Sequence, residues 1–478
     1  MTTGRRTARP AGFAGTCAGI VPPYLLEHLA EHVHDDLADR LRAALVLDAT
    51  HRTRRGATQQ LLAPPATGGA SVRRDDGTAP LRQVRDAHGT QDLPGDVVRE
   101  EGGEPTGDRA ADEAYDGLGA TWSLYRQAYG RDSLDDKGLG LDATVHYGTD
   151  YDNAFWDGTQ MVFGDGDGVV FRRFTIAVDV IGHELTHGVT ELTAGLEYQG
   201  QSGALNESVS DVFGSLVKQR QLGQDAASAD WLIGEGLFTP DVQGVALRSM
   251  KAPGTAYDDD RLGHDPQPAT MAGYVETSDD NGGVHMNSGI PNHAFYLAAA
   301  AIGGHAWQAP GQIWYDVLTG GSLPSDADFA TFAQATVDAA GRRFGAESTQ
   351  SRAVLEAWRQ VGVLQAGTRK GSADAGSTDS PAGSEAHAPV VVVERTGGFA
   401  GIPKSRDVDL RSLPSEEAER WRALLESAFL RQLSPERPQP DRYVYRVCCA
   451  PAGIDVTAAD QQLPDDVREL FERALRQT

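Results

Sequence analysis

Hydrophobic and polar residues follow two different patterns in the first 364 residues. From about residue 80 the apolar runs are short and are separated by glycine- and aspartate-rich turns, which predicts β-strands. Within them, YDNAFWDGTQMVF, from Tyr151, predicts two strands joined at Asp157 and Gly158 as a hairpin. From Phe174 to about Leu364 helical patterns dominate. Strands followed by helices predict an α+β fold with two segregated halves rather than repeated βαβ units.

Four further segments flank these two halves. Residues 1–50 include a run with helical apolar spacing and are interpreted as a leader, whereas residues 51–79 are basic, rich in glycine and proline, and aperiodic. We therefore expect an exposed processing segment at 51–79. Residues 365–389 carry almost no large apolar side chain, which predicts a flexible linker. Residues 390–478 alternate strand-like and helical patterns and predict a separate small α+β domain.

Composition excludes several classes of partner. The chain carries 68 acidic and 43 basic side chains, a formal net charge of −25. Repulsion of this size argues against nucleic acid or an anionic membrane as a partner. The longest apolar runs, such as FYLAAAAIGG from Phe295, are shorter than the roughly 18 residues that cross a bilayer. Three cysteines predict no disulfide framework.

The motif HELTH carries the first candidate chemistry. His183 and His187 are four residues apart, so they share one helix face and both imidazoles reach a single ion, for which Zn²⁺ is favoured. Glu207, in the later segment NESVSD, supplies a third ligand and leaves a fourth position open, as in catalytic rather than structural zinc sites. Asn206 and Asp211 suit acceptors that orient the ligand imidazoles, or helix-start caps.

Two other side chains suit acid–base chemistry. Glu184 follows a predicted metal ligand, where a carboxylate can take a proton from the attacking water. His285 follows a glycine pair in DNGGVHMNSG, a turn that aims a side chain into a cleft. Taken alone, HELTH is also compatible with two surface histidines on a helix, and His285 with an ordinary surface histidine in a turn.

Together the motifs resemble those of a known family. HELTH, GLEYQGQSGALNESVSD, NAFW, GDGDG, LRSM and DNGGVHMNSGI are similar to the motifs of the thermolysin-like zinc metalloendopeptidases, over about residues 80–364. The resemblance implies a β-rich lobe over 80–200 that includes the HExxH helix and a helical lobe over 201–364. The substrate cleft would lie between the two lobes.

The resemblance also implies a role for each matched residue. His183, His187 and Glu207 would bind zinc, and Glu184 would polarise the attacking water. A further group would support the reaction: His285 and Tyr198 would stabilise the oxyanion, and Asp280 would orient His285.

Substrate contacts are implied in the same way. Asn153 and the backbone of Ala154 would align a peptide as an added strand, and Arg248 would hold its carbonyl beyond the scissile bond. An apolar residue would be preferred just after that bond, with pocket walls from Phe174, Val180 and Leu247.

The calcium site of the family is matched only in part. Asp179, Asp230 and Glu235 match its acidic residues, but Lys218 and Leu232 stand where carboxylates are expected. An ammonium group can replace one ion, so the sequence leaves open whether Ca²⁺ binds here.

Both ends of the chain resemble regulatory segments. The leader, with CAGIVPPYLLEHLA, resembles the short pro-region of the protealysin branch, which would occupy the cleft until it is removed. Residues 390–478 resemble emfourin, a protein inhibitor of protealysin-like peptidases. An inhibitory domain is one interpretation; a substrate-targeting module and a stability element are the alternatives.

We therefore expect a monomeric neutral zinc endopeptidase, made as a zymogen, that acts on protein or peptide substrates. The alternatives are a non-catalytic peptide-binding protein on the same scaffold and a zinc aminopeptidase, which would need an amine-recognition motif. The N-terminus lacks the apolar core of a classical secretory signal. Release by a non-classical route is the family expectation, and a cytoplasmic location is the alternative.

Overall fold

The protein divides into two compact units, Met1–Arg369 and Lys370–Thr478, which are described separately. The computed structural model describes residues 19–33, 38, 41, 42, 45, 79–364, 390–397, 404–410, 413–426, 429, 430, 443–449 and 454–475. The expected processing segment, apart from residue 79, and the expected linker at 365–389 lie outside the described residues.

The first unit contains a five-stranded sheet in the order β2-β1-β3-β5-β4. Its strands are β1 (Arg82–Asp86), β2 (Asp96–Glu100), β3 (Leu141–Val145), β4 (Ala154–Trp156) and β5 (Met161–Phe163). Strands β1, β3 and β5 pair in parallel, whereas β2 and β4 pair antiparallel to their neighbours. The predicted hairpin is confirmed as β4–β5, and its turn extends to Gln160, whose carbonyl accepts from the Asp157 N–H at 3.0 Å.

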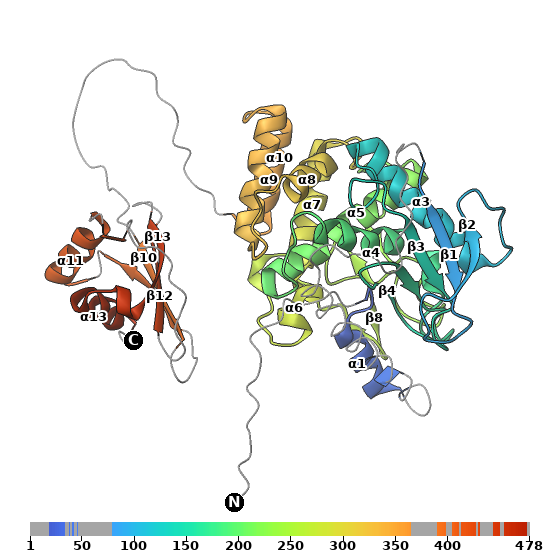
Figure 1. The fold of residues 1–478 in the computed structure, drawn as a ribbon, viewed down its shortest axis with the longest axis horizontal. Coiled ribbons are helices and arrows are strands. Elements are labelled where there is room, and N and C mark those ends of the chain that lie inside the picture. The colour runs from blue at the N-terminus through green and yellow to red at the C-terminus, as the bar shows by residue number, and fades with distance from the viewer. Residues whose placement is uncertain are drawn as a thin grey trace, which may run out of the picture. The chain divides into compact units, whose positions relative to one another are not determined.

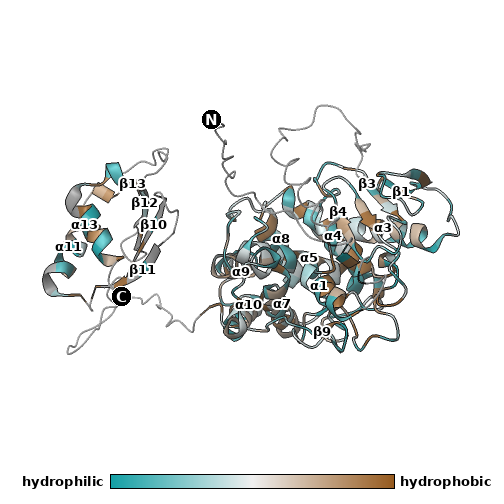
Figure 2. Ribbon diagram, turned by 90° about the horizontal axis from the view of Figure 1, so that it is seen from below, coloured by the Kyte–Doolittle hydropathy of each residue, from teal (hydrophilic) through white to brown (hydrophobic). Residues whose placement is uncertain are grey.

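A long helix, α3 (Arg109–Tyr129), interrupts the strands and packs against β1 and β3. The sequence pattern predicted only strands and turns here, so this part of the expectation is wrong. The Asp108 side chain caps the helix by accepting from the Ala111 N–H, and Gly130, at φ 74°, ends it. Figure 2 shows hydrophobic and hydrophilic residues along α3, as expected for a helix that covers a sheet with one face.

The second half of this unit is helical, as predicted (Figure 1). Its helices are α4 (Val178–Glu191), α5 (Gly200–Leu222), α6 (Asp280–Asn287), α7 (Gly289–Ile302), α8 (Ala309–Thr319), α9 (Phe329–Phe344) and α10 (Thr349–Gln360). Two short ribbons, β6 (Leu232–Ile233) with β7 (Arg248–Ser249) and β8 (Asp258–Asp259) with β9 (Gly263–His264), lie between α5 and α6 in the chain. The predicted α+β fold with segregated halves is confirmed.

Glycine sets how closely α4 and α5 pack. A Cβ atom on Gly214 would lie 2.3 Å from the Asp179 carbonyl oxygen, and one on Gly182 would lie 3.0 Å from the Gly214 Cα. A side chain at Gly214 would force the helices apart, and one at Gly182 would make an unusually tight contact, so glycine lets the two backbones approach directly. The remaining helices pack around a buried aromatic group in which the Trp314 and Trp358 rings stack at 6.1 Å.

The leader belongs to the first unit. Helix α1 (Pro23–His32) begins with proline at its first position, where the missing N–H costs no hydrogen bond. It buries Leu25, Leu26 and Leu29 in the same apolar cluster that contains the core of the strand-rich and helical halves. The predicted leader helix is therefore present over residues 23–32.

The described residues of the second unit form a four-stranded antiparallel sheet that packs with the helices α11 and α13. Its strands are β10 (Val390–Gly397), β11 (Lys404–Asp409), β12 (Tyr443–Cys449) and β13 (Ile454–Ala459), in the order β11-β10-β12-β13. Helices α11 (Ser415–Glu426) and α13 (Asp465–Ala474) pack through Trp421 and Phe471, whose rings stack at 5.6 Å. The predicted small α+β fold is confirmed. Among the described residues of both units, no helix is long and apolar enough to span a membrane.

Candidate active site

Two facing helices bring three metal-ligating side chains together. Helix α4 carries His183 and His187, and α5 carries Glu207, all buried. The two Nε2 atoms are 3.0 Å apart, and each lies 3.5 Å from an oxygen of Glu207. Ligand atoms about 2.0–2.1 Å from a tetrahedral ion are separated by about 3.3–3.4 Å, so these three atoms fit the first coordination sphere of such an ion.

The positions of the imidazole protons also support a metal site. The Nδ1 atom of His183 lies 2.8 Å from Asp211 Oδ1, and that of His187 lies 2.8 Å from Asn206 Oδ1. Because these partners are acceptors, each ring carries its proton on Nδ1 and turns an Nε2 lone pair toward the other ring. Two lone pairs and a carboxylate then converge in a buried space, an arrangement that repels itself unless a cation binds between them.

A buried ion pair holds the first imidazole. Arg248, on β7, donates through Nε and Nη2 to both oxygens of Asp211, at 2.9 and 2.8 Å. Burial favours the neutral acid, but the charge of Arg248 and the hydrogen bond from His183 outweigh it and hold the pKa of Asp211 well below its usual range. Asp211 therefore stays ionised and fixes the orientation of His183.

Two orienting residues were not anticipated. Ser210 Oγ lies 3.0 Å from His187 Nδ1, and Asn292 Nδ2 donates to Asp211 Oδ2 at 2.8 Å. Ser210 is one helical turn after Asn206, so the spacing alone could have indicated it. Asn292 comes from α7, and no local pattern connects it to the site.

Glu184 is buried beside the metal-ligating group. It follows His183 on α4, and its Oε2 atom accepts a hydrogen bond of 3.0 Å from the backbone N–H of Trp156, on β4. A charge-assisted bond to a backbone donor fixes the carboxylate without neutralising it. The role of Trp156 rests on its main chain, so its side-chain identity gave no signal in the sequence.

The His285 imidazole and the Tyr198 phenol also lie beside the metal-ligating side chains. His285 Nε2 lies 3.3 Å from the Tyr198 hydroxyl and 3.5 Å from Glu207 Oε2. Asp280 holds His285 through both its Nδ1, at 2.6 Å, and its backbone N–H, at 2.9 Å. Burial alone would lower the pKa of His285, but the carboxylates of Asp280 and Glu207 outweigh it and raise that pKa.

The predicted substrate-binding residues hold part of the leader. The Ile20 N–H donates to the Ala154 carbonyl at 3.0 Å, and the Val21 N–H donates to Asn153 Oδ1 at 3.0 Å. Arg248 Nη1 donates to the Ile20 carbonyl at 3.1 Å. The structure therefore brings these three predicted residues to one short peptide segment.

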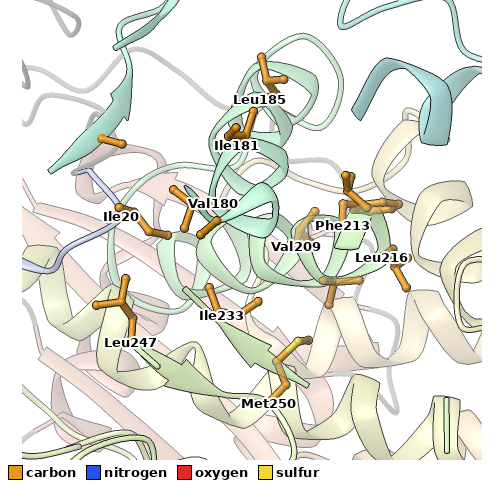
Figure 3. Packing of buried hydrophobic residues seen from close by; sticks show 14 of the residues in the cluster. Ile20, Val180, Ile181, Leu185, Val209, Phe213, Leu216, Ile233, Leu247 and Met250 are labelled. Carbon is orange, nitrogen blue, oxygen red and sulfur yellow. The ribbon is translucent and has the colours of Figure 1, made fainter. Parts of the chain in front are cut away.

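The side chain of Ile20 completes this contact. It is fully buried in the apolar cluster that also contains the three predicted pocket residues, Phe174, Val180 and Leu247. Figure 3 shows Ile20 beside Val180, with Leu247 below it in this view. The resemblance of the leader to a short pro-region implied that it occupies the cleft but did not single out Ile20.

The predicted calcium residues surround an ammonium group instead. Lys218 Nζ lies 2.9 Å from Asp230 Oδ2, 3.0 Å from Glu235 Oε2 and 3.7 Å from Asp179 Oδ2. These three carboxylates raise the pKa of Lys218 even though burial opposes its charge. Leu232 offers no oxygen from its side chain, and its N–H donates to Asp230 Oδ1 at 2.8 Å.

A two-lobed fold with a His₂Glu group, a neighbouring carboxylate and a peptide paired to an edge strand defines a metallopeptidase. Family models agree: residues 53–191 match "Thermolysin metallopeptidase, catalytic domain" and residues 194–363 match "Thermolysin metallopeptidase, alpha-helical domain". Residues 393–475 match the Emfourin family model.

Individual proteins give the same result. An extracellular metalloprotease of Pectobacterium carotovorum subsp. carotovorum is 51% identical over 348 residues, covering 72% of this chain and 96% of that relative. Protease PrtS of Photorhabdus sp. (strain Az29) is 46% identical over 352 residues, covering 72% and 92%. The solved precursor of protealysin, a metalloproteinase from Serratia proteamaculans, matches with a TM-score of 0.65 and 52% identity, covering 73% of this chain and all of that chain. This chain belongs to the thermolysin metallopeptidase family.

The geometry predicts that Asp211 controls the affinity for metal. In Asp211→Asn the neutral amide no longer balances the charge of Arg248 and accepts a weaker hydrogen bond from His183, so we expect Zn²⁺ affinity to fall by about 10- to 100-fold. Competition with a zinc-chelating dye measures this. Asp316→Asn is the matched control, since Asp316 pairs with Arg343 at a partly exposed position. Equal affinity in the two variants would contradict the assignment.

Proposed function

We propose that Zn²⁺ is the ion held by His183, His187 and Glu207 and that this chain uses it to hydrolyse internal peptide bonds. The observation that carries the proposal is the convergence of two Nε2 lone pairs and a carboxylate beside Glu184, next to a peptide bound along β4. Two imidazoles and one carboxylate form a donor set that zinc favours in catalytic sites.

Each remaining residue of the site takes part in the reaction. Bound Zn²⁺ supplies Lewis-acid chemistry that activates water and polarises the scissile carbonyl. Glu184, held by the Trp156 N–H, takes a proton from the attacking water and delivers it to the leaving amide nitrogen. His285 and Tyr198 donate hydrogen bonds to the developing oxyanion, while Asp280 keeps His285 in place.

The Glu184→Gln variant tests this mechanism. The amide keeps the shape of the side chain but cannot accept the proton, so we expect hydrolysis of casein to fall by about 10²- to 10⁴-fold while Zn²⁺ remains bound. A chelator should abolish the activity of the unmodified enzyme. Glu356→Gln, on an exposed turn of α10, is the control. Full activity in Glu184→Gln would refute the mechanism. An unmodified protein that hydrolyses no casein when it is loaded with zinc and freed of its leader would favour the non-catalytic alternative.

The leader keeps this site latent in our proposal. It uses Asn153, Ala154 and Arg248, the residues assigned to substrate, so a bound leader and a bound substrate exclude each other. Peptides with an apolar residue after the scissile bond would then take the place of Ile20. That the enzyme acts outside the cell and as a monomer stays a prediction; two of the relatives carry "extracellular" in their names.

We also propose that Lys218 replaces calcium as the cation of the Asp179, Asp230 and Glu235 cluster. Its ammonium group already lies within hydrogen-bonding distance of two of these carboxylates. A divalent cation at the same position would be repelled by a charge that cannot leave.

The stability of Lys218→Met tests this exchange of cations. Without the ammonium the carboxylates repel one another, so we expect the free energy of unfolding to fall by on the order of 2 kcal/mol. Added Ca²⁺ should restore part of this loss in the variant and leave the melting temperature of the unmodified chain unchanged. Lys251→Met, at an exposed lysine, is the control. Stabilisation of the unmodified chain by Ca²⁺, but not Mg²⁺, would contradict the proposal.

We propose that the second unit limits the activity of the mature enzyme. The match of residues 393–475 to the Emfourin model supports an inhibitory role over substrate targeting or stabilisation. This unit has a hydrophobic core of its own around Trp421, Tyr445 and Phe471, so it can be removed or produced separately.

Truncation after Arg369 tests this role. After leader removal, the truncated enzyme should hydrolyse a fluorogenic peptide faster than the full chain, because the inhibitor is no longer tethered at a high effective concentration. The isolated unit, residues 370–478, should lower the rate again when it is added. Equal rates for peptides, together with slower cleavage of one protein substrate by the truncated enzyme, would instead indicate targeting.

A further inference from the structure

The leader pairs with the open edge of the sheet as a substrate strand does. Strand β4 is the last strand of the sheet, with β5 as its neighbour on one side. On its other edge, Ile20 pairs with Ala154 and Val21 pairs with the side chain of Asn153. Residue numbers rise along the leader as they fall along β4, so the pairing is antiparallel.

This pairing fixes which bond faces the reacting groups. The Ala154 carbonyl and the Trp156 N–H lie on the same edge of β4, on residues whose Cα atoms are about 7 Å apart. The first accepts from the Ile20 N–H, and the second donates to Glu184. Because the leader is antiparallel, the chain runs from Ile20 back through Gly19 toward Trp156 and Glu184. The peptide bond on that side of Ile20 is Gly19–Ile20.

Gly19 lies directly against the strand. A Cβ atom at this position would be 2.5 Å from both the Ala154 carbonyl oxygen and Asn153 Oδ1. Any side chain would push the backbone away from β4, so glycine allows the bond to Ile20 to lie close to the strand edge. On the other side of the bond, the buried Ile20 side chain and the Arg248–carbonyl hydrogen bond hold the nitrogen end in place.

We propose that Gly19–Ile20 is a self-cleavage site, cut by the active site that it occupies. This inference rests on the proposed endopeptidase function. The oxygen of a water molecule bonds to the Gly19 carbonyl carbon, and the carbon–nitrogen bond to Ile20 breaks. Glu184 transfers the proton of that water to the Ile20 nitrogen. The products are a carboxylate on Gly19 and a new α-amino group on Ile20.

The cut does not by itself release the leader. After it, Ile20 keeps its buried side chain and its hydrogen bond from Arg248, and Val21 keeps both hydrogen bonds to Asn153. Helix α1 also keeps Leu25, Leu26 and Leu29 in the core. The remaining leader is then a bound product, and activation requires a second cut nearer the expected processing segment at 51–79.

The order of cuts can be followed by mass. The full chain is purified without metal, Zn²⁺ is added, and intact mass and N-terminal sequence are recorded over time. We expect a species that begins at Ile20 to appear before leader-free enzyme, at a first-order rate that does not depend on protein concentration. Glu184→Gln should show no such species. Ile20→Asp should lose this cut, whereas Leu222→Asp, at an exposed position, should keep it.

Binding of the leader has a readout that does not need activity. In metal-free Glu184→Gln, hydrogen exchange should show protected Ile20 and Val21 amides, and Ile20→Asp should remove this protection. Unprotected amides in the parent protein would overturn the inference. The self-cleavage inference also fails if the chain matures and hydrolyses an added peptide while the Gly19–Ile20 bond of the leader stays intact. The proposed endopeptidase function stands in that case. If neither the leader nor the peptide is cut, both fail.

Discussion

The close crossing of α4 and α5 is the constraint on which the site depends. Gly182 and Gly214 let the two backbones come into direct contact, and a Cβ atom at Gly214 would lie 2.3 Å from the Asp179 carbonyl oxygen. Gly182 precedes His183, and Gly214 lies two helical turns after Glu207 on the same face of α5. The distance between the helices therefore sets the distance between imidazole and carboxylate. A wider crossing would separate the ligand atoms beyond the span of one ion.

One buried charge network connects His183 of the metal-ligating group to the bound leader. Asp211 lies between His183 and Arg248, and Arg248 also binds the leader carbonyl. Ionised Asp211 is stable in the interior only because Arg248 and several donors surround it. The same arginine that compensates the buried carboxylate thus presents its remaining N–H groups to the peptide. Contact with the leader and the orientation of the His183 imidazole cannot be changed independently at this position.

The sequence predicted those features that lie within one helix or one hairpin. The four-residue interval of His183 and His187 and the turn at Asp157 were readable because one helix or one hairpin contains them. Helix α3 was missed because it contains glycines that lower helix propensity. They are there for packing: a Cβ on Gly117 would lie 2.3 Å from Ile181 Cδ1, and one on Gly119 would lie 2.4 Å from Arg82 Nη1. Tertiary contact outweighed local preference in this helix.

The partners that the sequence did not indicate act across long separations or through the main chain. Asn292, on α7, donates to Asp211 across 81 residues of the chain, and no local pattern connects the two. The Trp156 N–H serves Glu184 regardless of its side chain. Ile20 is one apolar residue among many in the leader, and only the register against β4 distinguishes it.

That register depends on the hydrogen-bonding groups that β4 and Asn153 present at the edge of the sheet. An unpaired strand edge attracts any extended chain, which is useful for binding substrates but unspecific. Here Trp156 has its N–H committed to Glu184, and Ala154 offers one carbonyl. Asn153 supplies the next acceptor and donor from its side-chain amide, which bonds both the N–H and the carbonyl of Val21. These groups fix the direction of an extended peptide and its distance from β4, and the apolar pocket selects the side chain that takes the position of Ile20. With Ile20 in the pocket, the peptide bond on the side of Trp156 and Glu184 is Gly19–Ile20.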